Sequence, residues 1–355
     1  MWDVLVAGAG PAGALAALVL AQAGRRVLLI DEIQSNAHKV GESLPGAARQ
    51  ILQSLDLLAT VESGSHLPCY GNVSAWGSDQ LISHDFIGDP RGLGWHLDRV
   101  QFDEELRSAA LRAGAVWWRN RVKAVTWMNP TWRICLKECE VHSSWLIDAT
   151  GRAASLARSQ RVIRQRDMPL FASYRWGVSA DDDTETRTFI EAVPNGWWYT
   201  ARLPHHIRVI IFHTDAKEAT QIRRKPDFWD VYLEDTQYLR QGLGQMTYID
   251  SPQLIAAGGG CLDSVAGSHW IATGDAALTF DPISSQGIFN ALYTGMAAGK
   301  AVHAALIGDL SAVDAYVDRL KAIRAAYRRH HDFIYRSENR WADKPFWALR
   351  QRSLV

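Results

Sequence analysis

The chain has 355 residues, which is long enough for a large hydrophobic core or for two lobes. Its 38 basic and 38 acidic side chains give a formal net charge of zero, so charge gives no reason to expect a nucleic acid or another polyanion as partner. Cys135 and Cys139 form a CxxxC pair, but no second pair completes a zinc site. We therefore expect reduced thiols, no metal and a cytoplasmic protein.

Neither a signal peptide nor a membrane span is predicted. The first residues lead directly into an apolar strand, which leaves no room for a signal sequence. No apolar run reaches the roughly 18–20 residues that cross a bilayer, and the apolar helix expected from Ala12 to Ala23 is too short. The 15 tryptophans are unusual, and those in the second half either fill a core or wall a pocket.

The first stretch with a chemical meaning runs from Asp3 to Asp31. An apolar strand over Val4–Ala7 leads into GAGPAG, then an alanine- and leucine-rich helix, and a second apolar strand over Val27–Ile30 that ends at Asp31. Strand, glycine turn, helix, strand and acid within one βαβ unit are typical of a dinucleotide site. Ordinary packing also uses glycine turns, but here every other part falls where the mechanism needs it.

Each glycine of this turn has a distinct expected role. Gly8 permits the tight turn, Gly10 lets the backbone approach a pyrophosphate, and Gly13 lets the helix pack closely on the strand. The helix N-terminus offers free N–H groups and a positive dipole end to the phosphates. The carboxylate of Asp31 is placed to bind the ribose hydroxyls of the adenosine.

The chain up to position 152 alternates between helices and strands. A helix is expected over about 47–58 and another over 101–113, where apolar residues recur with a helical period and Gly114 follows as a stop signal. The expected strands are 72–76, 81–86, 116–118, 122–128, 132–136 and 144–147.

The second half changes character. Strands dominate over 171–178, 187–193, 196–203 and 207–213, which predicts a mostly antiparallel sheet, and a helix over about 226–240 interrupts them. We expect a flexible loop at Gly258–Gly260, a core strand at 269–273, and long helices at 287–306 and 311–333.

A second glycine-bearing turn, far from the first, carries Asp275. Its carboxylate could bind a cofactor polyol, which the ribityl chain of FAD has and NAD lacks, although a helix-capping role is the ordinary alternative. After it, 281–288 reads DPISSQGI and opens a helix. A helix N-terminus directed at the flavin N1–C2=O edge would stabilise the anionic reduced flavin. The ordinary alternative is an N-cap loop with Ser284 or Ser285 as the cap.

Five motifs together carry a family resemblance. They are GAGPAG at 8–13, GESLP at 41–45, GWHLDRVQFD at 94–103, DATGR at 148–152 and GDAALTFDPISSQGI at 274–288. In this combination the chain resembles the p-hydroxybenzoate-hydroxylase-like flavoproteins, a superfamily of single-component aromatic hydroxylases and flavin-dependent halogenases. The resemblance extends over nearly the whole chain and implies FAD as the cofactor.

The resemblance implies an α/β fold with a Rossmann-like FAD-binding domain, a second lobe built on a mostly antiparallel β-sheet, and a C-terminal helical segment. We place the FAD-binding domain at 1–165 and 255–310, the substrate lobe at 166–254, and the C-terminal helix and tail at 311–355.

The resemblance also implies the site residues. FAD is expected to contact Gly8, Gly10, Pro11, Ala12, Gly13, Asp31, Glu32, Ser43, Arg99, Gly151, Gly274, Asp275, Pro282, Gln286, Gly287 and Ile288. Catalytic candidates are Glu42, His96 and Gln286, although Glu42 and His96 also suit structural roles. Trp197, Trp198 and Tyr199 are candidate substrate contacts, although a packed strand is the commoner use of such a run.

Two chemistries compete within this superfamily, and both proceed through a flavin C4a-hydroperoxide. A hydroxylase transfers oxygen to an electron-rich ring, whereas a halogenase lets halide attack the peroxide and uses an essential lysine some thirty residues after the GES-like loop. Here no lysine lies between Lys39 and Lys123. The halogenase WxWxIP motif has only a degenerate counterpart at 196–202, and Ser285-Gln286-Gly287 resembles the hydroxylase loop. These departures favour oxygen transfer.

A more specific likeness is to the flavoproteins that mature cysteine-tryptophylquinone oxidases, such as lysine ε-oxidase and glycine oxidase, by hydroxylating a peptidyl tryptophan. It rests on GWHLDRVQFD, on NGWWYTARLP at 195–204 and on the tail at 335–347. The substrate would then be a tryptophan-bearing protein. A halogenase, a hydroxylase of small aromatics, an isoprenoid reductase and a non-catalytic FAD-containing maturation partner remain alternatives.

The electron donor stays open. Many single-component hydroxylases carry an Asp-Gly motif that serves FAD and NAD(P)H, but Ala149-Thr150-Gly151 stands at that place. The reductant is therefore either NAD(P)H or reduced flavin from a partner reductase. The basic run from Arg328 to His331, late in the last long helix, is expected to be a solvated face that complements the helix dipole.

Overall fold

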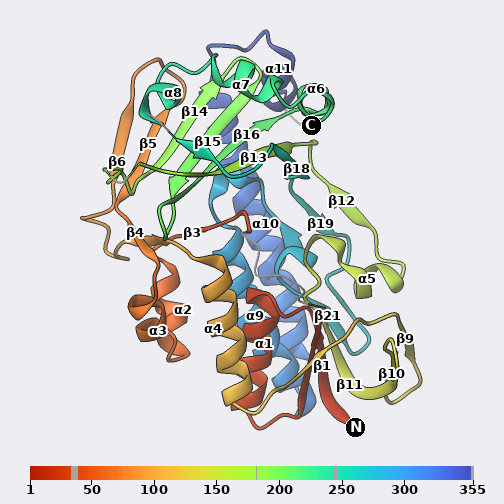
Figure 1. The fold of residues 1–355 in the computed structure, drawn as a ribbon. Coiled ribbons are helices and arrows are strands. Elements are labelled where there is room, and N and C mark those ends of the chain that lie inside the picture. Colours follow the sequence, from red (N-terminus) through yellow and green to blue (C-terminus); the bar gives the residue numbers. More distant parts are fainter. Residues whose placement is uncertain (33–38, 181, 244–245, 353–355) are drawn as a thin grey trace.

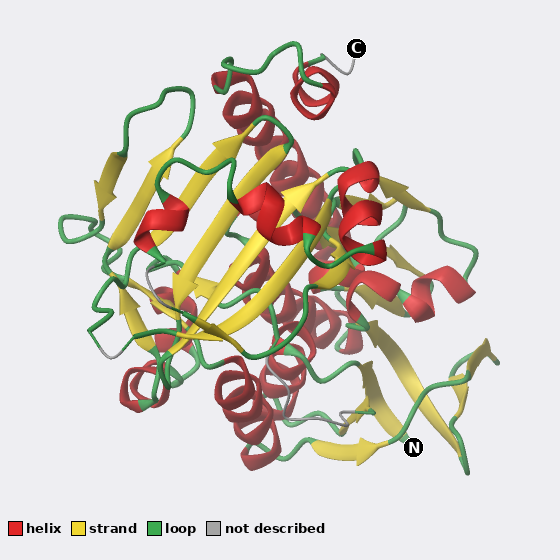
Figure 2. Cartoon of the chain, turned by 45° about the horizontal axis from the view of Figure 1, so that its top comes forward, coloured by secondary structure: helices red, strands yellow, loops and turns green. Residues whose placement is uncertain are grey.

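The computed structural model describes residues 1–32, 39–180, 182–243 and 246–352, so positions 353–355 of the expected tail lie outside the described residues. Two large sheets dominate the molecule (Figure 1). The first lies in the lower half beside a group of long helices, and the second lies in the upper half with short helices across its outer face (Figure 2).

The first sheet is mainly parallel. Its central order is β20-β21-β11-β1-β2-β8, and the hairpin of β9 and β10 extends β11. The pairs β1–β11, β1–β2, β2–β8 and β11–β21 are all parallel. The strands are β1 (Trp2–Ala7), β2 (Val27–Asp31), β8 (Val116–Arg119), β9 (Ala124–Trp127), β10 (Trp132–Cys135), β11 (Glu140–Asp148), β20 (Ala266–Gly267) and β21 (Trp270–Ala272).

The second sheet is antiparallel except for the pair of β14 with β5. Its order is β17-β13-β16-β15-β14-β5-β6, with β18 also paired to β13. It draws β5 and β6 from the part of the chain that the sequence assigned to the FAD-binding region. The strands are β5 (Gly71–Ala75), β6 (Ile82–Asp85), β13 (Phe171–Val178), β14 (Thr188–Val193), β15 (Gly196–Arg202), β16 (Ile207–Thr214), β17 (Thr247–Tyr248) and β18 (Gln253–Ala256).

Two small three-stranded sheets connect these halves. One contains β3 (Ser43–Leu44), β4 (Leu67–Cys69) and β7 (Gly94–His96), and the other β12 (Arg164–Arg166), β19 (Gly260–Leu262) and β22 (Leu278–Thr279). The helices are α1 (Pro11–Gln22), α2 (Ala48–Ser54), α3 (Leu58–Ser63), α4 (Arg99–Arg112), α5 (Ser155–Ser159), α6 (Ala216–Arg224), α7 (Phe228–Leu233), α8 (Leu239–Gly242), α9 (Gly287–Leu306), α10 (Ser311–Ser337) and α11 (Pro345–Gln351), with short 3-10 turns η1 (Gly151–Ala153), η2 (Gly274–Ala276) and η3 (Pro282–Ser284).

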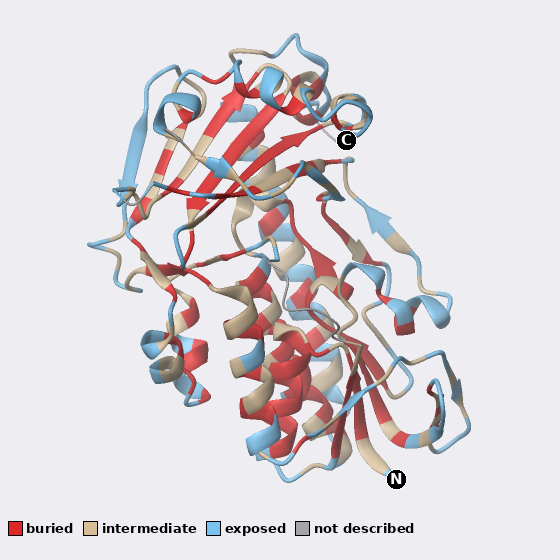
Figure 3. Cartoon of the chain, viewed as in Figure 1, coloured by how far each residue is buried: buried red, intermediate tan, exposed pale blue. Residues whose placement is uncertain are grey.

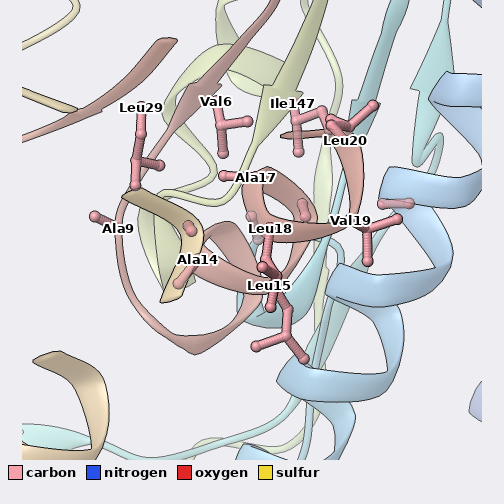
Figure 4. Close-up of a cluster of buried hydrophobic side chains, with 14 of the residues drawn as sticks. Val6, Ala9, Ala14, Leu15, Ala17, Leu18, Val19, Leu20, Leu29 and Ile147 are labelled. Atoms are coloured by element: carbon pink, nitrogen blue, oxygen red, sulfur yellow. The ribbon is translucent and has the colours of Figure 1, made fainter. Parts of the chain in front are cut away.

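Helix α1 is buried on nearly every side because it lies between the first sheet and the helices α4 and α9. Figure 4 shows its small side chains Ala14 and Ala17 below the strands, with Val19 turned towards a neighbouring helix. In α9, the missing Cβ atom of Gly295 would lie 2.3 Å from the carbonyl oxygen of Ala12. Backbone-to-backbone contact therefore sets the distance between α1 and α9.

The fold class expected from the sequence is confirmed, and several element boundaries are corrected. The helix expected over 47–58 is two helices, α2 and α3, because Asp56 has a positive φ of 57° between them. Helix α4 begins at Arg99 because the Asp98 carboxylate caps it by accepting from two backbone N–H groups. Helix α10 extends to Ser337, beyond the expected end at 333.

The helix expected over 226–240 is also wrong as a single element. Helix α6 precedes it and ends before Pro226, and α7 and α8 follow as separate short helices. The buried carboxylate of Glu191 accepts hydrogen bonds from the N–H groups of Gln237, Tyr238 and Leu239, which holds the chain out of helix just before α8. A side chain from β14 thus divides a segment that the local sequence pattern joins.

Gly258–Gly260, expected as a flexible loop, is a packed connection. A Cβ atom on Gly259 would lie 2.5 Å from the Asp167 carboxylate, and one on Gly260 would lie 2.6 Å from the carbonyl oxygen of Gln165. The glycines are needed here for close approach rather than for mobility. In the described part of the chain, no helix combines the length and apolarity that crossing a bilayer requires.

Buried residues concentrate in the strands of the two large sheets and in the helices that pack against them (Figure 3). The core of the first sheet and its helices is one cluster, whereas the two faces of the second sheet carry separate clusters. Trp197 belongs to the inner cluster with α10 and α11, and Trp198 belongs to the outer cluster under α7. Tryptophans thus fill cores on both faces of this sheet.

Replacing Gly295 by alanine should destabilise the fold. The new methyl would enter the space of the Ala12 backbone, and overpacking of this kind costs about 1–3 kcal/mol. Thermal unfolding followed by circular dichroism should show a lower Tm. Gly242→Ala is the control, since nothing lies within 4 Å of its Cβ position; an unchanged Tm for Gly295→Ala would contradict close α1–α9 contact.

Candidate functional site

A partly open cavity of about 360 Å³ lies where the first sheet meets the second. Its wall includes Gly10 and Ala12 from the first glycine turn, Asp275 from the second, and Tyr199 and His213 from the second sheet. The two turns meet because Gly274 faces α1, where a Cβ atom would lie 2.7 Å from the Ala12 side chain. A cavity of this size matches sites for small organic ligands and cofactors.

The three glycines of the first turn have different surroundings. A Cβ on Gly8 would lie 2.1 Å from the carbonyl oxygen of Ala149, and a Cβ on Gly13 would lie 1.8 Å from that of Gly8. Gly8 also has a φ of 101°, which L side chains rarely adopt. By contrast, nothing lies within 4 Å of the Cβ position of Gly10. Gly8 and Gly13 therefore serve packing, while Gly10 leaves open space beside the cavity.

The N-terminus of α1 points to this open space. The cap residue Gly10 makes no side-chain cap, Pro11 has no N–H, and Ala12 lines the cavity. Uncapped N–H groups and the positive end of the helix dipole suit a phosphate group. Asp31 braces the turn from β2, because its carboxylate accepts a hydrogen bond of 2.6 Å from the N–H of Ala9.

The second turn is held by arginines. Arg152 lies with Nε 3.6 Å from the Asp275 carboxylate, and its guanidinium also donates to the carbonyls of Ala256 and Gly258. Arg164 donates to the carbonyl of Asp275. Protein encloses the Asp275 carboxyl, yet 35% of the side chain remains exposed towards the cavity. Burial raises its pKa, which the nearby arginines only partly offset.

These residues fit an FAD. The first turn offers backbone N–H groups and an open glycine to a pyrophosphate, Arg99 and Arg152 supply positive charge beside it, and Asp275 offers a carboxyl group to a polyol. The N-terminal end of α9, at Gln286 and Gly287, also lines the cavity and has no side-chain cap. It can therefore place a second positive dipole end beside the ligand.

Glu42 and Tyr199 lie together at one end of the cavity. Both are buried, and the Glu42 carboxylate accepts a hydrogen bond of 2.8 Å from the N–H of Gly41. Burial raises the pKa of Glu42, even though the neighbouring Tyr199 and Arg99 oppose the shift. Burial, together with the charge of Glu42, also raises the pKa of Tyr199. The Tyr199 hydroxyl interacts with Glu42 and Thr188, although neither forms a hydrogen bond of good geometry with it among the described residues.

His96 lies behind this pair rather than in the cavity wall. Its Nε2 is 3.0 Å from the Thr188 hydroxyl, and burial lowers its pKa to about 4. The ring is therefore neutral at ordinary pH. Because Thr188 also interacts with Tyr199, His96 can act on the cavity only through these intermediate side chains.

His213 and Asp281 also line the cavity, and His213 lies on β16, next to the strand β15 that carries Tyr199. His213 stacks on Trp197 with ring centroids 3.7 Å apart, and burial lowers its pKa to about 3. Burial would raise the pKa of Asp281, but the hydrogen bond and charge of His331 outweigh it and hold that pKa below its usual value. The cavity wall thus also holds a neutral imidazole, that of His213, and the carboxyl group of Asp281.

Comparison with known proteins identifies the family. The model of the FAD binding domain matches residues 1–48. LodB of Marinomonas mediterranea, a protein assigned to the FAD-dependent oxidoreductases, is 30% identical over 98% of this chain and 96% of its own length. The chain belongs to this family of FAD-dependent oxidoreductases. FAD is accordingly its cofactor.

Solved structures share the fold over the full chain. The myxobacterial chondrochloren halogenase CndH matches with a TM-score of 0.91 at 21% identity, covering 100% of this chain and 86% of that one. QhpG, a peptidyl tryptophan dihydroxylase essential for tryptophylquinone cofactor biogenesis, matches with a TM-score of 0.80 at 23% identity, covering 100% of this chain and 80% of that one. At these identities the matches show the fold of this FAD-dependent oxidoreductase.

The cavity brings together most of the residues that the sequence proposed. Those that line it are Gly10, Pro11, Ala12, Glu42, Ser43, Arg99, Gly151, Tyr199, Asp275, Pro282, Gln286, Gly287 and Ile288. Those that do not line it are Gly8, Gly13, Asp31, Glu32, His96, Gly274, Trp197 and Trp198.

The tryptophans of β15 do not wall the cavity. Trp197 is separated from it by the His213 ring, and Trp198 points to the other face of the sheet, where it packs edge-on against Trp229. Side chains alternate between the two faces of a sheet along a strand. Trp197 therefore shares a face with Tyr199, and Trp198 does not. Among the described lining residues there is no tryptophan.

Sequence reasoning missed Arg152, His213 and the role of His331. Arg152 belongs to the DATGR motif, from which the family resemblance pointed only to Gly151. His213 follows Val209 and Ile211 on the same face of the buried strand β16. A polar residue at the next position of this alternating apolar pattern was the sequence signal for a functional side chain. His331 was assigned to a solvated face, whereas its ring turns inward to Asp281.

Gly10 and Gly13 give a matched test of FAD binding. Gly10→Val should fold, because its Cβ position is open, but should lose FAD, because the side chain would occupy the space beside the helix N-terminus. Gly13→Val should fail to fold, because Gly8 occupies its Cβ position. Absorbance near 450 nm reports the flavin, and circular dichroism reports the fold. A yellow Gly10→Val protein would contradict this placement of the cofactor.

Proposed function

We propose that this protein is an FAD-dependent monooxygenase that hydroxylates an aromatic substrate, with a peptidyl tryptophan as the favoured substrate. The observation that carries the proposal is the pair of Glu42 and Tyr199 in the cavity wall. A carboxyl group with a raised pKa and the neighbouring phenol face the same space as the two cofactor turns. Among the described residues, no lysine lines that space.

The bound and reduced flavin would supply the activation of dioxygen, and the chain supplies proton donors and an apolar wall. Burial raises the pKa of Glu42, which favours its acid form, and the acid form can donate a hydrogen bond or a proton to the reacting oxygen. Tyr199 can donate a second hydrogen bond or orient the aromatic substrate. The apolar side chains of Ala172, Ile211 and Phe280 exclude water from the reacting region.

A halogenase is the second candidate, because the chain shares the complete fold of CndH. Halogen transfer in that class needs a lysine near the substrate. Lys39, the cationic lysine nearest the GES-like loop in sequence, is 3.0 Å from the Asp103 carboxylate and does not line the cavity. The wall carries Ser285-Gln286-Gly287 where the halogenase motif has Ser-Thr-Gly. Both features favour oxygen transfer over halogen transfer.

The preference for a peptidyl tryptophan is supported by the relatives and by the mouth of the cavity. QhpG acts on a peptidyl tryptophan, and the sequence resembles flavoproteins that mature quinone-cofactor oxidases. Ile255, an exposed residue of the short strand β18, lines the cavity and places apolar surface at its edge. A protein segment could approach along this edge. Reduced flavin from a partner reductase, or NAD(P)H, would supply electrons in the cytoplasm.

Within this proposal, 1–165 with 255–310 form the FAD-binding domain, 166–254 form the substrate lobe, and 311–355 are the C-terminal helix and tail. A non-catalytic maturation partner would need the cofactor only for stability. Variants that bind FAD but cannot be reduced distinguish the two, because only an enzyme loses its effect on the substrate protein.

Incubation of reduced holoprotein with oxygen and a tryptophan-bearing peptide should add oxygen atoms to the peptide. Mass spectrometry should show a gain of about 16 or 32 mass units on the tryptophan, carrying label from ¹⁸O₂, as transfer from a reduced flavin requires. Free tryptophan and indole serve as comparison substrates. A product that appears only with added chloride or bromide, and carries halogen, would instead establish the halogenase.

Glu42→Gln should retain FAD and reduce hydroxylation by about a hundredfold, since an amide donates a hydrogen bond but no proton. In the wild type, activity should fall as pH rises through the raised pKa of Glu42, because the acid form is the donor. The variant should lose this limb of the pH profile. Glu62→Gln, an exposed partner of Arg49, is the control. A wild-type-like pH profile in Glu42→Gln would rule out the acid role.

A further inference from the structure

Asp281 occupies the wall between the cavity and a second, smaller groove. It lines the cavity together with His213, and it also lines a groove on the far side whose wall includes Asp167, His331 and Asp332. Its side chain is buried, so the residue lies between the two hollows without being part of the outer surface. Among the residues named for either hollow, Asp281 is common to both.

Helix α10 holds this carboxylate with one face. The Asp281 Oδ2 atom accepts a hydrogen bond of 3.1 Å from the Tyr335 hydroxyl and lies 3.4 Å from Nε2 of His331. One turn earlier, the Tyr327 hydroxyl accepts a hydrogen bond of 2.8 Å from the N–H of Asp281. The spacing 327, 331, 335 places all three rings on one side of the helix. Figure 1 shows α10 running beside α9 up to the second sheet.

The imidazole of His331 connects Asp281 to solvent. Its Nδ1 lies 3.3 Å from the Asp332 carboxylate, and its side chain is 19% exposed, against 44% for Asp332. Asp281, His331 and Asp332 therefore form a row of polar side chains through the wall. Asp332, at the outer end of this row, is partly exposed to solvent. The imidazole nitrogens of His331 lie 3.4 Å from the Asp281 carboxylate and 3.3 Å from the Asp332 carboxylate. Both distances are near the limit of a direct hydrogen bond.

Several charged groups surround His331. Burial would lower its pKa, but the hydrogen bonds and charges of Asp281 and Asp332 outweigh burial and raise it. The tyrosines Tyr327 and Tyr335 contact the ring at centroid distances of 5.5 and 4.7 Å. The remaining charged groups facing the groove are Asp167, with its partner Arg324, and Arg328, Arg350 and Arg352.

We propose that Asp281 and His331 form a proton path through the wall, from the flavin and substrate cavity to the outer groove. A proton that reaches the Asp281 carboxylate from the cavity neutralises it. His331 then loses the ion pair that holds its charge and releases its own proton from Nδ1 towards Asp332 and water. The pair returns to its starting state when the proton on Asp281 moves to the reoriented imidazole, so one proton enters and one leaves.

This path deepens the proposed function and rests on it, because hydroxylation of an aromatic ring releases the ring hydrogen as a proton. The inference can nevertheless be tested without oxygen or substrate. Ferricyanide oxidises the reduced flavin of the holoprotein anaerobically; two ferricyanide ions each take one electron, and one proton is released per flavin. Proton release during flavin oxidation can therefore be measured and interpreted even if the protein hydroxylates none of the substrates tested.

The test is a stopped-flow experiment with two signals. Flavin absorbance reports oxidation, and a pH-indicator dye in weak buffer reports arrival of the proton in bulk water. In the wild type the two signals should coincide. In His331→Gln, which can hydrogen-bond to Asp281 but cannot carry a proton, release should lag by about tenfold or more. His330→Gln is the matched control, since His330 is exposed on the same helix.

Chemical rescue separates proton transfer from a structural effect. In His331→Ala, added imidazole should restore the rate of proton release in proportion to its concentration, whereas a distorted wall would not respond. If the His331 variants do not retain FAD, Asp332→Asn decides, because this residue lies at the exposed end. A lag in that variant supports the path. Proton release that keeps pace with flavin oxidation, in His331→Gln or in Asp332→Asn used in its place, overturns it.

Discussion

Close contact between backbones, with no side chain in between, is the constraint on which the cavity depends. The carbonyls of Ala149 and Gly8 occupy the positions where Gly8 and Gly13 would carry Cβ atoms, and Gly295 allows the same between α9 and Ala12. These contacts draw the two glycine turns to one place, although they are far apart in the chain. A side chain at any of these positions would separate the elements and remove the shared wall.

The local sequence pattern was sufficient to predict the helices and strands that these backbone contacts bring together. The βαβ unit at the start of the chain combines two apolar strands, a glycine turn and a helix with no breaker, so each level of the pattern agrees with the others. The strands of the second sheet followed from alternation and β-branched residues for the same reason. Where distant side chains decide, pattern failed: Glu191 divides the segment 226–240 into separate helices through contacts that no local window contains.

Motifs located the candidate site, but not the direction of each side chain. Trp198 lies between two residues whose side chains face the inner cluster, and only the register of β15 against β16 shows that it faces away. The run from Arg328 to His331 looked uniformly basic, yet His331 turns inward while its neighbours remain exposed. In both cases the property that matters is set by what packs against the element, which sequence spacing alone does not reveal.

Burial acts on two carboxyl groups of the cavity wall, with opposite results. At Glu42 desolvation dominates and raises the pKa of the carboxyl group. At Asp281 the same desolvation is outweighed by His331, which is itself supported by Asp332, so the pKa of this carboxyl group is lowered. Two carboxyl groups whose pKa values move in opposite directions are the arrangement that an acid and a base need in one site. The wall of one cavity thus holds a carboxyl group whose shifted pKa favours the acid form and another whose shifted pKa favours the base form.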